Sequence, residues 1–271
     1  MALRFDTVSF LSDYGLADEF VGVVKSVIRS IAGGVDVIDV SHQVPPHDVR
    51  SGSLTLVRAV QYLASGVVLA VVDPGVGTAR RAVAVEVGDG DYVFVGPDNG
   101  LLASAISMVG GAVRAVSLTN TDYHLPAPGP TFAGRDIFAA AAAHICNGVD
   151  LAELGEEIDP VTMRPGLIPV PREEGDRLLA EILWVDHFGN AQLNIGPEDI
   201  DGFGDRIVLR FRDEVRTARI SPTYDEIKPG EVGIVVDSYG LLSLAFARMS
   251  LADDLRLRPG DGVSLDLPAS S

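Results

Sequence analysis

Two kinds of hydrophobic pattern alternate over the first 73 positions. Segments 7–13, 35–41 and 67–73 are short and rich in apolar residues, as strands buried on both faces of a sheet are. Segment 18–33 carries apolar residues at three- and four-residue spacing, which indicates an amphipathic helix, and 49–63 is a second helix candidate. This β-α-β-α-β order predicts a parallel sheet with helices on both faces.

Further elements continue this pattern and complete an α/β domain that we expect to span residues 1–160, with a largely parallel sheet. Two strand candidates resemble a hairpin around the sequence GDGD, and two helix candidates follow with a strand between them. The two hairpin strands are 81–87 and 92–97, the helices 99–109 and 135–147, and the last strand 112–118.

The pattern changes after about residue 160. Proline and polar residues without a sustained period predict a linker at 161–176. Short strand candidates bounded by Gly, Asp or Pro then predict a small all-β barrel or sandwich over residues 177–271. These candidates read LLAEILWVD, NAQLNI, DRIVLRF, EVGIVVDS, LLSLAFA and DGVSLDL.

Composition narrows the class of protein. A chain of 271 residues is long enough for two domains, and its formal charge of −17 argues against binding of nucleic acid, which needs clustered Lys and Arg. No apolar run approaches the roughly 18 residues of a membrane span, and the first residues do not resemble a signal peptide, so we expect a cytoplasmic protein. The single cysteine, Cys146, has no partner for a disulfide and is expected in the core.

Polar residues gather where several predicted strands end. Asp13 ends the first strand, Asp73 ends the third, and the turn 96–99 (GPDN) ends another. Since open α/β sheets bind ligands at the carboxyl ends of parallel strands, these residues predict a ligand site there. The alternative is that each Asp or Asn only caps the following turn or helix.

The ligand class follows from what the sequence lacks. The dinucleotide fingerprint is absent, since its nearest match, GVGTAR at 75–80, ends in Arg, and no phosphate-binding G-K-[ST] occurs. A nucleoside or another small polar molecule is therefore favoured. The five histidines show no close ligand spacing, so we expect no metal site and no cofactor.

Five motifs, spread over nearly the whole chain, resemble the S-adenosyl-L-methionine (SAM) hydroxide adenosyltransferases, which hydrolyse SAM to adenosine and L-methionine and are relatives of the SAM-dependent fluorinases and chlorinases. The resemblance implies an α/β domain, a β-barrel domain, and a homotrimer with active sites where one subunit's first domain meets its neighbour's second. The motifs are FLSDYG (10–15), VVDPGVGTARR (71–81), GPDNGLL (96–102), TFAGRDIFAAAAAH (131–144) and VDHFGNAQLNI (185–195).

The resemblance also implies a role for each matching residue. Asp13 would bind the two ribose hydroxyls, and SAM would be a substrate rather than a cofactor. Residues expected around the ribose and adenine are Thr131, Phe132, Tyr224, Phe188 and Asn190, and those expected around the methionine are Asp18, Asp186 and Ser238. Judged from the residues alone, Phe132 and Phe188 fit core positions equally well, and Asp186 fits a turn.

The implied reaction is an attack of water on the 5′ carbon of SAM. Family members use an Asp, an Arg and a His, and the first two match Asp73 and Arg80. The histidine position is Ala133 here, which predicts weakened turnover with binding largely retained. Either His47 or His124 is a candidate substitute if it reaches the pocket.

Two rival functions remain at this point. A halogenase is disfavoured because the carboxylate of Asp73 would repel a bare halide, and Gly134 lacks the hydroxyl that fluorinases place at the matching position. A non-catalytic protein that binds SAM or adenosine is the other rival, and Ala133 favours it.

Overall fold

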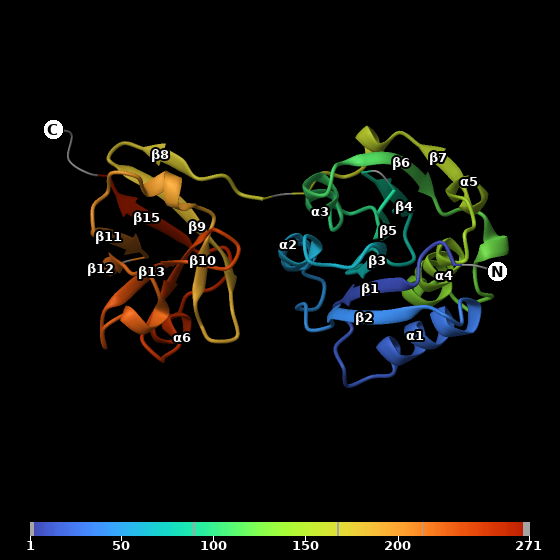
Figure 1. Cartoon of the computed structure of the whole chain (residues 1–271), viewed down its shortest axis with the longest axis horizontal. Coiled ribbons are helices and arrows are strands. Elements are labelled where there is room, and N and C mark those ends of the chain that lie inside the picture. The colour runs from blue at the N-terminus through green and yellow to red at the C-terminus, as the bar shows by residue number, and fades with distance from the viewer. Residues whose placement is uncertain (1–2, 89, 167, 213, 268–271) are drawn as a thin grey trace. The chain divides into compact units, whose positions relative to one another are not determined.

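The computed structural model describes residues 3–88, 90–166, 168–212 and 214–267. The chain divides into two compact units, an N-terminal unit Met1–Leu167 and a C-terminal unit Ile168–Ser271. Figure 1 labels the helices and strands of each unit.

A seven-stranded sheet forms the centre of the N-terminal unit, with the order β2-β1-β3-β5-β4-β6-β7. The first four strands in that order are mutually parallel, whereas β4 pairs antiparallel with both β5 and β6, and β7 is antiparallel to β6. The predicted hairpin is therefore confirmed, although residue 89 of its turn lies outside the described residues. The strands are β1 (Thr7–Ser12), β2 (Asp36–Ser41), β3 (Gly66–Val71), β4 (Ala82–Val87), β5 (Tyr92–Pro97), β6 (Ala112–Ser117) and β7 (Glu156–Ile158).

Helices cover both faces of this sheet, as the sequence predicts. Strand β3 shows why: its alternate residues Val67 and Leu69 pack into one apolar cluster, and Val68 and Ala70 pack into another. The first cluster lies beneath α1 (Phe20–Ile31) and α4 (Ala140–Cys146), and the second beneath α2 (Val49–Val60) and α3 (Ala103–Met108). A short α5 (Leu151–Leu154) precedes β7.

The predicted helix at 135–147 begins differently from an ordinary α-helix. A π-helical turn at Gly134–Ala139 leads into α4, so the two together cover the predicted segment. Such turns widen a helix locally and are frequent at functional sites. Cys146, at the end of α4, is fully buried, and burial raises the pKa of its thiol to about 12. The prediction that this cysteine belongs to the core is confirmed.

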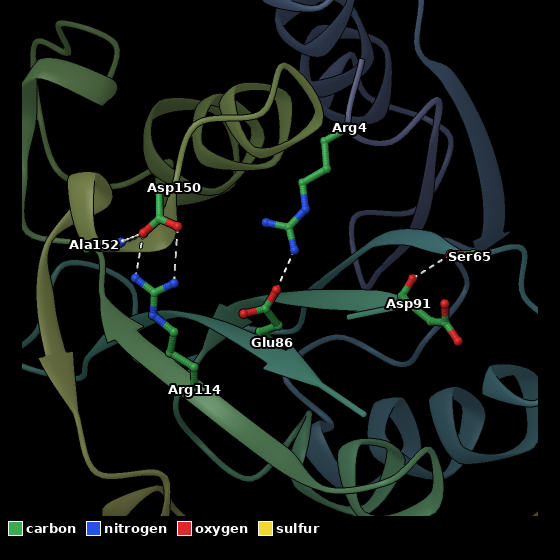
Figure 2. A network of polar contacts seen from close by, with 7 residues as sticks. All are labelled: Arg4, Ser65, Glu86, Asp91, Arg114, Asp150 and Ala152. Atoms are coloured by element: carbon green, nitrogen blue, oxygen red, sulfur yellow. Dashed lines mark hydrogen bonds and ion pairs between the residues drawn. The ribbon is translucent and has the colours of Figure 1, made fainter. Parts of the chain in front are cut away.

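Polar contacts tie strands β4 and β6 of this unit to neighbouring segments of the chain (Figure 2). The Arg114 guanidinium on β6 donates two hydrogen bonds to Asp150, at 2.5 and 3.2 Å. Asp150 also caps α5, since its side chain accepts a hydrogen bond from the Ala152 amide at 2.9 Å. Arg4 forms an ion pair with Glu86 on β4.

The C-terminal unit is a closed barrel of seven strands. The strand order is β10-β14-β13-β12-β11-β15-β9, and pairing of β10 with β9 closes the ring. Its interior holds one apolar cluster that includes Ile182, Leu193, Leu209 and Leu244. The strands are β9 (Arg177–Val185), β10 (Ala191–Leu193), β11 (Arg206–Phe211), β12 (Glu214–Ile220), β13 (Val232–Val236), β14 (Leu242–Ala245) and β15 (Gly262–Asp266), with α6 at Leu251–Leu255.

Two strands of this unit were not predicted. Strand β12 (EVRTARI) has only Ala218 buried, so the apolar pattern that marks a strand is missing. It forms because β11 and β13 supply hydrogen-bonding partners on both sides. The other strand, β8 (Arg172–Glu174), pairs with the start of β9 and lies inside the segment predicted as a linker.

Candidate functional site

Two of the aspartates predicted at strand ends lie together. Strands β1 and β3 are parallel neighbours, with Ser12 opposite Val71, so Asp13 and Asp73 follow them at the same edge of the sheet. Both residues line one cavity of about 570 Å³, which we call the Asp73 cavity. Its wall also includes Tyr14, Phe20, His47, Thr131, Phe132, Ala133, Gly134 and Arg135.

The GPDN turn does not contribute to this cavity, so that part of the prediction is wrong. Asp98 is buried and binds Arg81, whose Nε lies 2.8 Å from a carboxylate oxygen. Asn99 donates a hydrogen bond to the Val72 carbonyl at 2.8 Å. Here the alternative, a structural role in the turn, accounts for both residues.

A buried ion pair joins Asp73, which lines the Asp73 cavity, to Arg80, which lines a neighbouring cavity. The Arg80 Nε donates a hydrogen bond to Asp73 Oδ1 at 2.8 Å, and Nη2 contacts the other carboxylate oxygen. The two side chains are 14% and 6% exposed, and the guanidinium also stacks over the Phe138 ring. The carboxylate is thus held in a fixed orientation, as a group that must align a reactant has to be.

The loop between these two residues has little room to move. Gly77 has φ +78°, and a side chain there would lie 3.2 Å from the Pro130 carbonyl oxygen. The Val76 amide donates to the Asp73 carbonyl, and the Thr78 amide donates to the Gly75 carbonyl. The sequence DPGVGTAR therefore encodes a compact turn that brings Arg80 back to Asp73.

Aromatic rings form a second wall. Phe132 meets Tyr14 edge to face at 5.7 Å between ring centres and meets Phe20 at 5.2 Å. The Arg135 guanidinium lies over the Phe132 ring. Because Phe132 also lines the cavity, it is not simply a core residue. Flat apolar surfaces of this kind suit a ribose or a purine.

Tyr14 places its hydroxyl against Gly134. A Cβ atom at Gly134 would lie 1.9 Å from the Tyr14 oxygen, so the position accepts no side chain while the tyrosine stays in place. Burial, followed by the charges of Asp13 and Asp73, raises the pKa of the Tyr14 phenol. Tyr14 therefore remains protonated and can donate a hydrogen bond.

Asp13 is held by the chain that follows β2. One carboxylate oxygen accepts a hydrogen bond from the His47 amide at 2.8 Å, and His47 has φ +69°, unusual for a residue with a side chain. The His47 side chain lines the Asp73 cavity. The sequence offered His47 only as a possible substitute histidine, and gave no sign of its contact with Asp13.

Ala133 lies between two cavities. It is 6% exposed and lines both the Asp73 cavity and a neighbouring cavity of about 650 Å³, which we call the His124 cavity. Arg80, Asp136 and His124 line this second space. Burial lowers the pKa of His124, so its imidazole is mostly neutral at pH 7.

The C-terminal unit carries a separate cavity of about 620 Å³, lined by Asp186, Phe188, Asn190, Tyr224 and Ser250, among others. Phe188 is 75% exposed, so it is not a core residue. Asp186 accepts hydrogen bonds from the Phe188 amide at 2.9 Å and from the Asn190 side chain at 2.8 Å. Asp186 thereby fixes the turn that presents the other two residues.

Two predicted site residues lie outside these walls. Asp18 and Ser238 are both exposed, and neither is part of a cavity wall described above. Tyr14 and Phe20 belong to the Asp73 cavity, although the sequence assigned neither a role in binding. The sequence could have indicated a role for Tyr14, because this residue lies inside the FLSDYG motif.

Metal binding has no support among the residues that the structure describes, where no group of three or more His, Cys, Asp or Glu is arranged around a common point. The described helices also include none long and apolar enough to cross a membrane.

Comparison with known proteins agrees with the motifs. The model of the SAM hydroxide adenosyltransferase N-terminal domain matches residues 8–155, and that of the C-terminal domain matches residues 180–264. An (R)-S-adenosyl-L-methionine hydrolase of Salinispora tropica is 44% identical over 94% of this chain and 95% of its own length. A fluorinase of Actinoplanes sp. is 30% identical over 93% of this chain and 95% of its own length.

The fold agrees as well. The crystal structure of an uncharacterized conserved protein from Thermotoga maritima matches with a TM-score of 0.86 and 32% identity, covering 96% of this chain and 99% of that one. Both domain models match in order, at the positions of the two compact units. The chain therefore belongs to the SAM hydroxide adenosyltransferase family of enzymes.

Proposed function

We propose that this protein hydrolyses SAM to adenosine and L-methionine. The observation that carries the proposal is the Asp73 carboxylate, which is buried, held by Arg80 and in the wall of a cavity that also presents Asp13 and aromatic rings. The names of the curated relatives support the same substrate.

The reaction is an in-line displacement at the 5′ carbon. A water oxygen forms a bond to that carbon while the bond from carbon to sulfur breaks and its electron pair passes to sulfur, giving the neutral thioether of methionine. Because this leaving group needs no proton, the protein has only to orient the water and accept one of its protons. Asp73 is the acceptor in this proposal, and Arg80 fixes its orientation.

The remaining residues would bind the substrate. Asp13 would accept hydrogen bonds from the ribose hydroxyls, while Thr131, Phe132 and Tyr14 surround the sugar and base. In a homotrimer, Phe188, Asn190 and Tyr224 of a neighbouring subunit would complete the site, since they line a cavity of their own unit. Asp18, Asp186 and Ser238 remain candidates for the methionine end.

Ala133 would limit the rate of this reaction. Its methyl group lines the cavity beside the Asp73–Arg80 pair and can neither donate nor accept a proton. His47 lines the same cavity and His124 lines the neighbouring one, so either imidazole could compensate only from a different direction. We therefore propose a weakened hydrolase, with a SAM-binding protein without turnover as the alternative that Ala133 supports.

Halide is a poorer nucleophile for this site than water. The Asp73 carboxylate would repel an anion in a cavity with little bulk water to screen the charges. A serine at Gly134 would also collide with the Tyr14 hydroxyl, so the packing of this loop leaves no room for an added hydroxyl there.

The test is a chromatographic measurement of adenosine formed from SAM, with and without chloride, for the protein and for Ala133→His. We expect Ala133→His to form adenosine at least about tenfold faster, since a positioned acid or base contributes roughly 10²–10⁴. Ala127→His, which adds an imidazole at the His124 cavity only, is the matched control.

Two results would redirect the proposal. If neither protein forms adenosine while both bind SAM, a binding function is the better account. Formation of 5′-chloro-5′-deoxyadenosine in chloride would instead identify a halogenase.

A further inference from the structure

We propose that His42 is a positioning residue that sets the geometry of the loop carrying Asp13 and Tyr14. The inference rests on the proposed function, since Asp13 and Tyr14 belong to the proposed substrate site. The loop in question, residues 12–15, connects β1 to the segment before α1.

His42 is buried beneath this loop. Its side chain is 2% exposed and meets the Phe10 ring edge to face at 4.6 Å between ring centres. The Nδ1 atom lies 2.8 Å from the Ser12 hydroxyl, which is itself fully buried. The backbone carbonyl of His42 accepts a hydrogen bond from the Gly15 amide at 2.8 Å. One residue thus contacts both ends of the loop.

The hydrogen bonds around Ser12 indicate which ring nitrogen of His42 carries the proton. The Tyr14 amide donates to the Ser12 oxygen at 3.3 Å, and the Ser12 hydroxyl can then donate its own hydrogen to Nδ1 of a neutral His42 ring. This assigns the ring proton to Nε2, which lies 3.1 Å from Asp39 Oδ1. Nε2 has no hydrogen-bond partner among the residues that the structure describes, so its contact with Asp39 is electrostatic.

Asp39 lies at the outer end of this series of polar contacts, which runs from Tyr14 through Ser12 and His42. Partial burial raises the pKa of Asp39, but the contacts with Lys25 and His42 outweigh it and hold the pKa below its usual value. The Lys25 ammonium donates a hydrogen bond to Asp39 at 2.6 Å. The carboxylate therefore stays charged and favours the tautomer of His42 that accepts from Ser12.

The same segment holds Asp13 from the other side, because the His47 amide donates to its carboxylate. Fixing the loop at Ser12, Gly15 and Asp13 leaves the Asp13 carboxylate pre-oriented for a diol. Since Asp13 would grip the ribose equally in the substrate and in the transition state, loss of this support should weaken binding rather than the chemical step.

The experiment compares His42→Leu with His42→Asn in the full-length protein. Asn can place a polar atom near the position of Nδ1 and keep the contact with Ser12, whereas Leu removes it. We expect His42→Leu to raise KM for SAM and the Kd for adenosine about tenfold while kcat changes less than about threefold. His42→Asn should recover most of this loss, and thermal unfolding of both variants checks that they fold.

His144→Asn is the matched control, because His144 is a partly buried histidine of the same unit that does not line the Asp73 cavity. Equal binding by His42→Leu and the unsubstituted protein would overturn the positioning role while leaving the proposed function intact. A fall in kcat with unchanged KM would also overturn it. If the unsubstituted protein neither binds SAM nor forms adenosine, the proposed function fails, and the positioning role falls with it.

Discussion

Two ion pairs in the N-terminal unit have the same chemistry and opposite surroundings. In each, an arginine guanidinium contacts both carboxylate oxygens of an aspartate. The side chains of Arg80 and Asp73 are 14% and 6% exposed and line cavities, whereas those of Arg114 and Asp150 are 29% and 55% exposed at the outer strands (Figure 2). The two pairs therefore differ in burial rather than in chemistry.

The reason is electrostatic. Water around the Arg114–Asp150 pair screens its charges, so the contact adds little beyond fixing the end of α5. Around Asp73 and Arg80 there is less water, and each charge depends on the other for its solvation. Under the proposed function, the oriented Asp73 carboxylate would position one water molecule.

The largest expected effect separates the two aspartates by function. Asp73→Asn should lower the rate of adenosine formation by about 10²–10⁴, since the amide cannot accept the proton of water. Asp150→Asn should leave the rate within about twofold. Both are checked by steady-state kinetics with SAM, and an Asp73→Asn protein of unchanged rate would remove Asp73 from the mechanism.

Substitution of the two arginines should lower the free energy of unfolding by different amounts. Arg80→Gln leaves a buried carboxylate without its partner and should lower the free energy of unfolding by about 3 kcal/mol. Arg114→Gln, at the surface, should cost less than about 1 kcal/mol. Urea unfolding measures both, and equal losses would show that the difference in burial has no energetic consequence.

A single methyl group tests how closely the cavity wall is packed. Gly134→Ala places a Cβ atom 1.9 Å from the Tyr14 hydroxyl, so the ring must move, at a cost of about 1–3 kcal/mol in unfolding free energy. Gly22→Ala is the matched control, because Gly22 is exposed on α1 with nothing within 4 Å of its added Cβ. It should stabilise the protein by up to about 1 kcal/mol. A neutral Gly134→Ala would mean that Tyr14 is free to turn away.

The smallest expected effect is a pH dependence at the surface pair. The hydrogen bond from Arg114 lowers the pKa of Asp150 to about 2, below the roughly 3.9 of an unfolded aspartate. Its contribution to stability is therefore fully present above about pH 4 and is lost as the pH falls through about 2. The difference in unfolding free energy between the protein and Asp150→Asn, less than about 1 kcal/mol, should shrink over that range. A difference that grows towards low pH would contradict this assignment.

Regular elements were predictable where apolar residues follow a local pattern. Helix α1 presents apolar residues at helical spacing, and strand β3 is a short apolar run that is buried throughout, so the sequence indicated both. Strand β12 exposes nearly all its side chains and depends on β11 and β13 for its hydrogen bonds, which no local pattern records. The π-helical turn at Gly134–Ala139 was not predicted either, because the sequence pattern there does not distinguish a π-helical turn from the start of an α-helix.

By itself the sequence determined the order of most elements, the strand ends at Asp13 and Asp73, and the five family motifs, because each is local in the chain. Only the tertiary structure decided that Asp73 lines a cavity while bound to Arg80, and that Asp98 is instead buried against Arg81. It also decided that His42 supports the loop of Asp13. Those outcomes depend on which side chains meet across the sheet and on how much water remains between them, and neither quantity is written in any single segment.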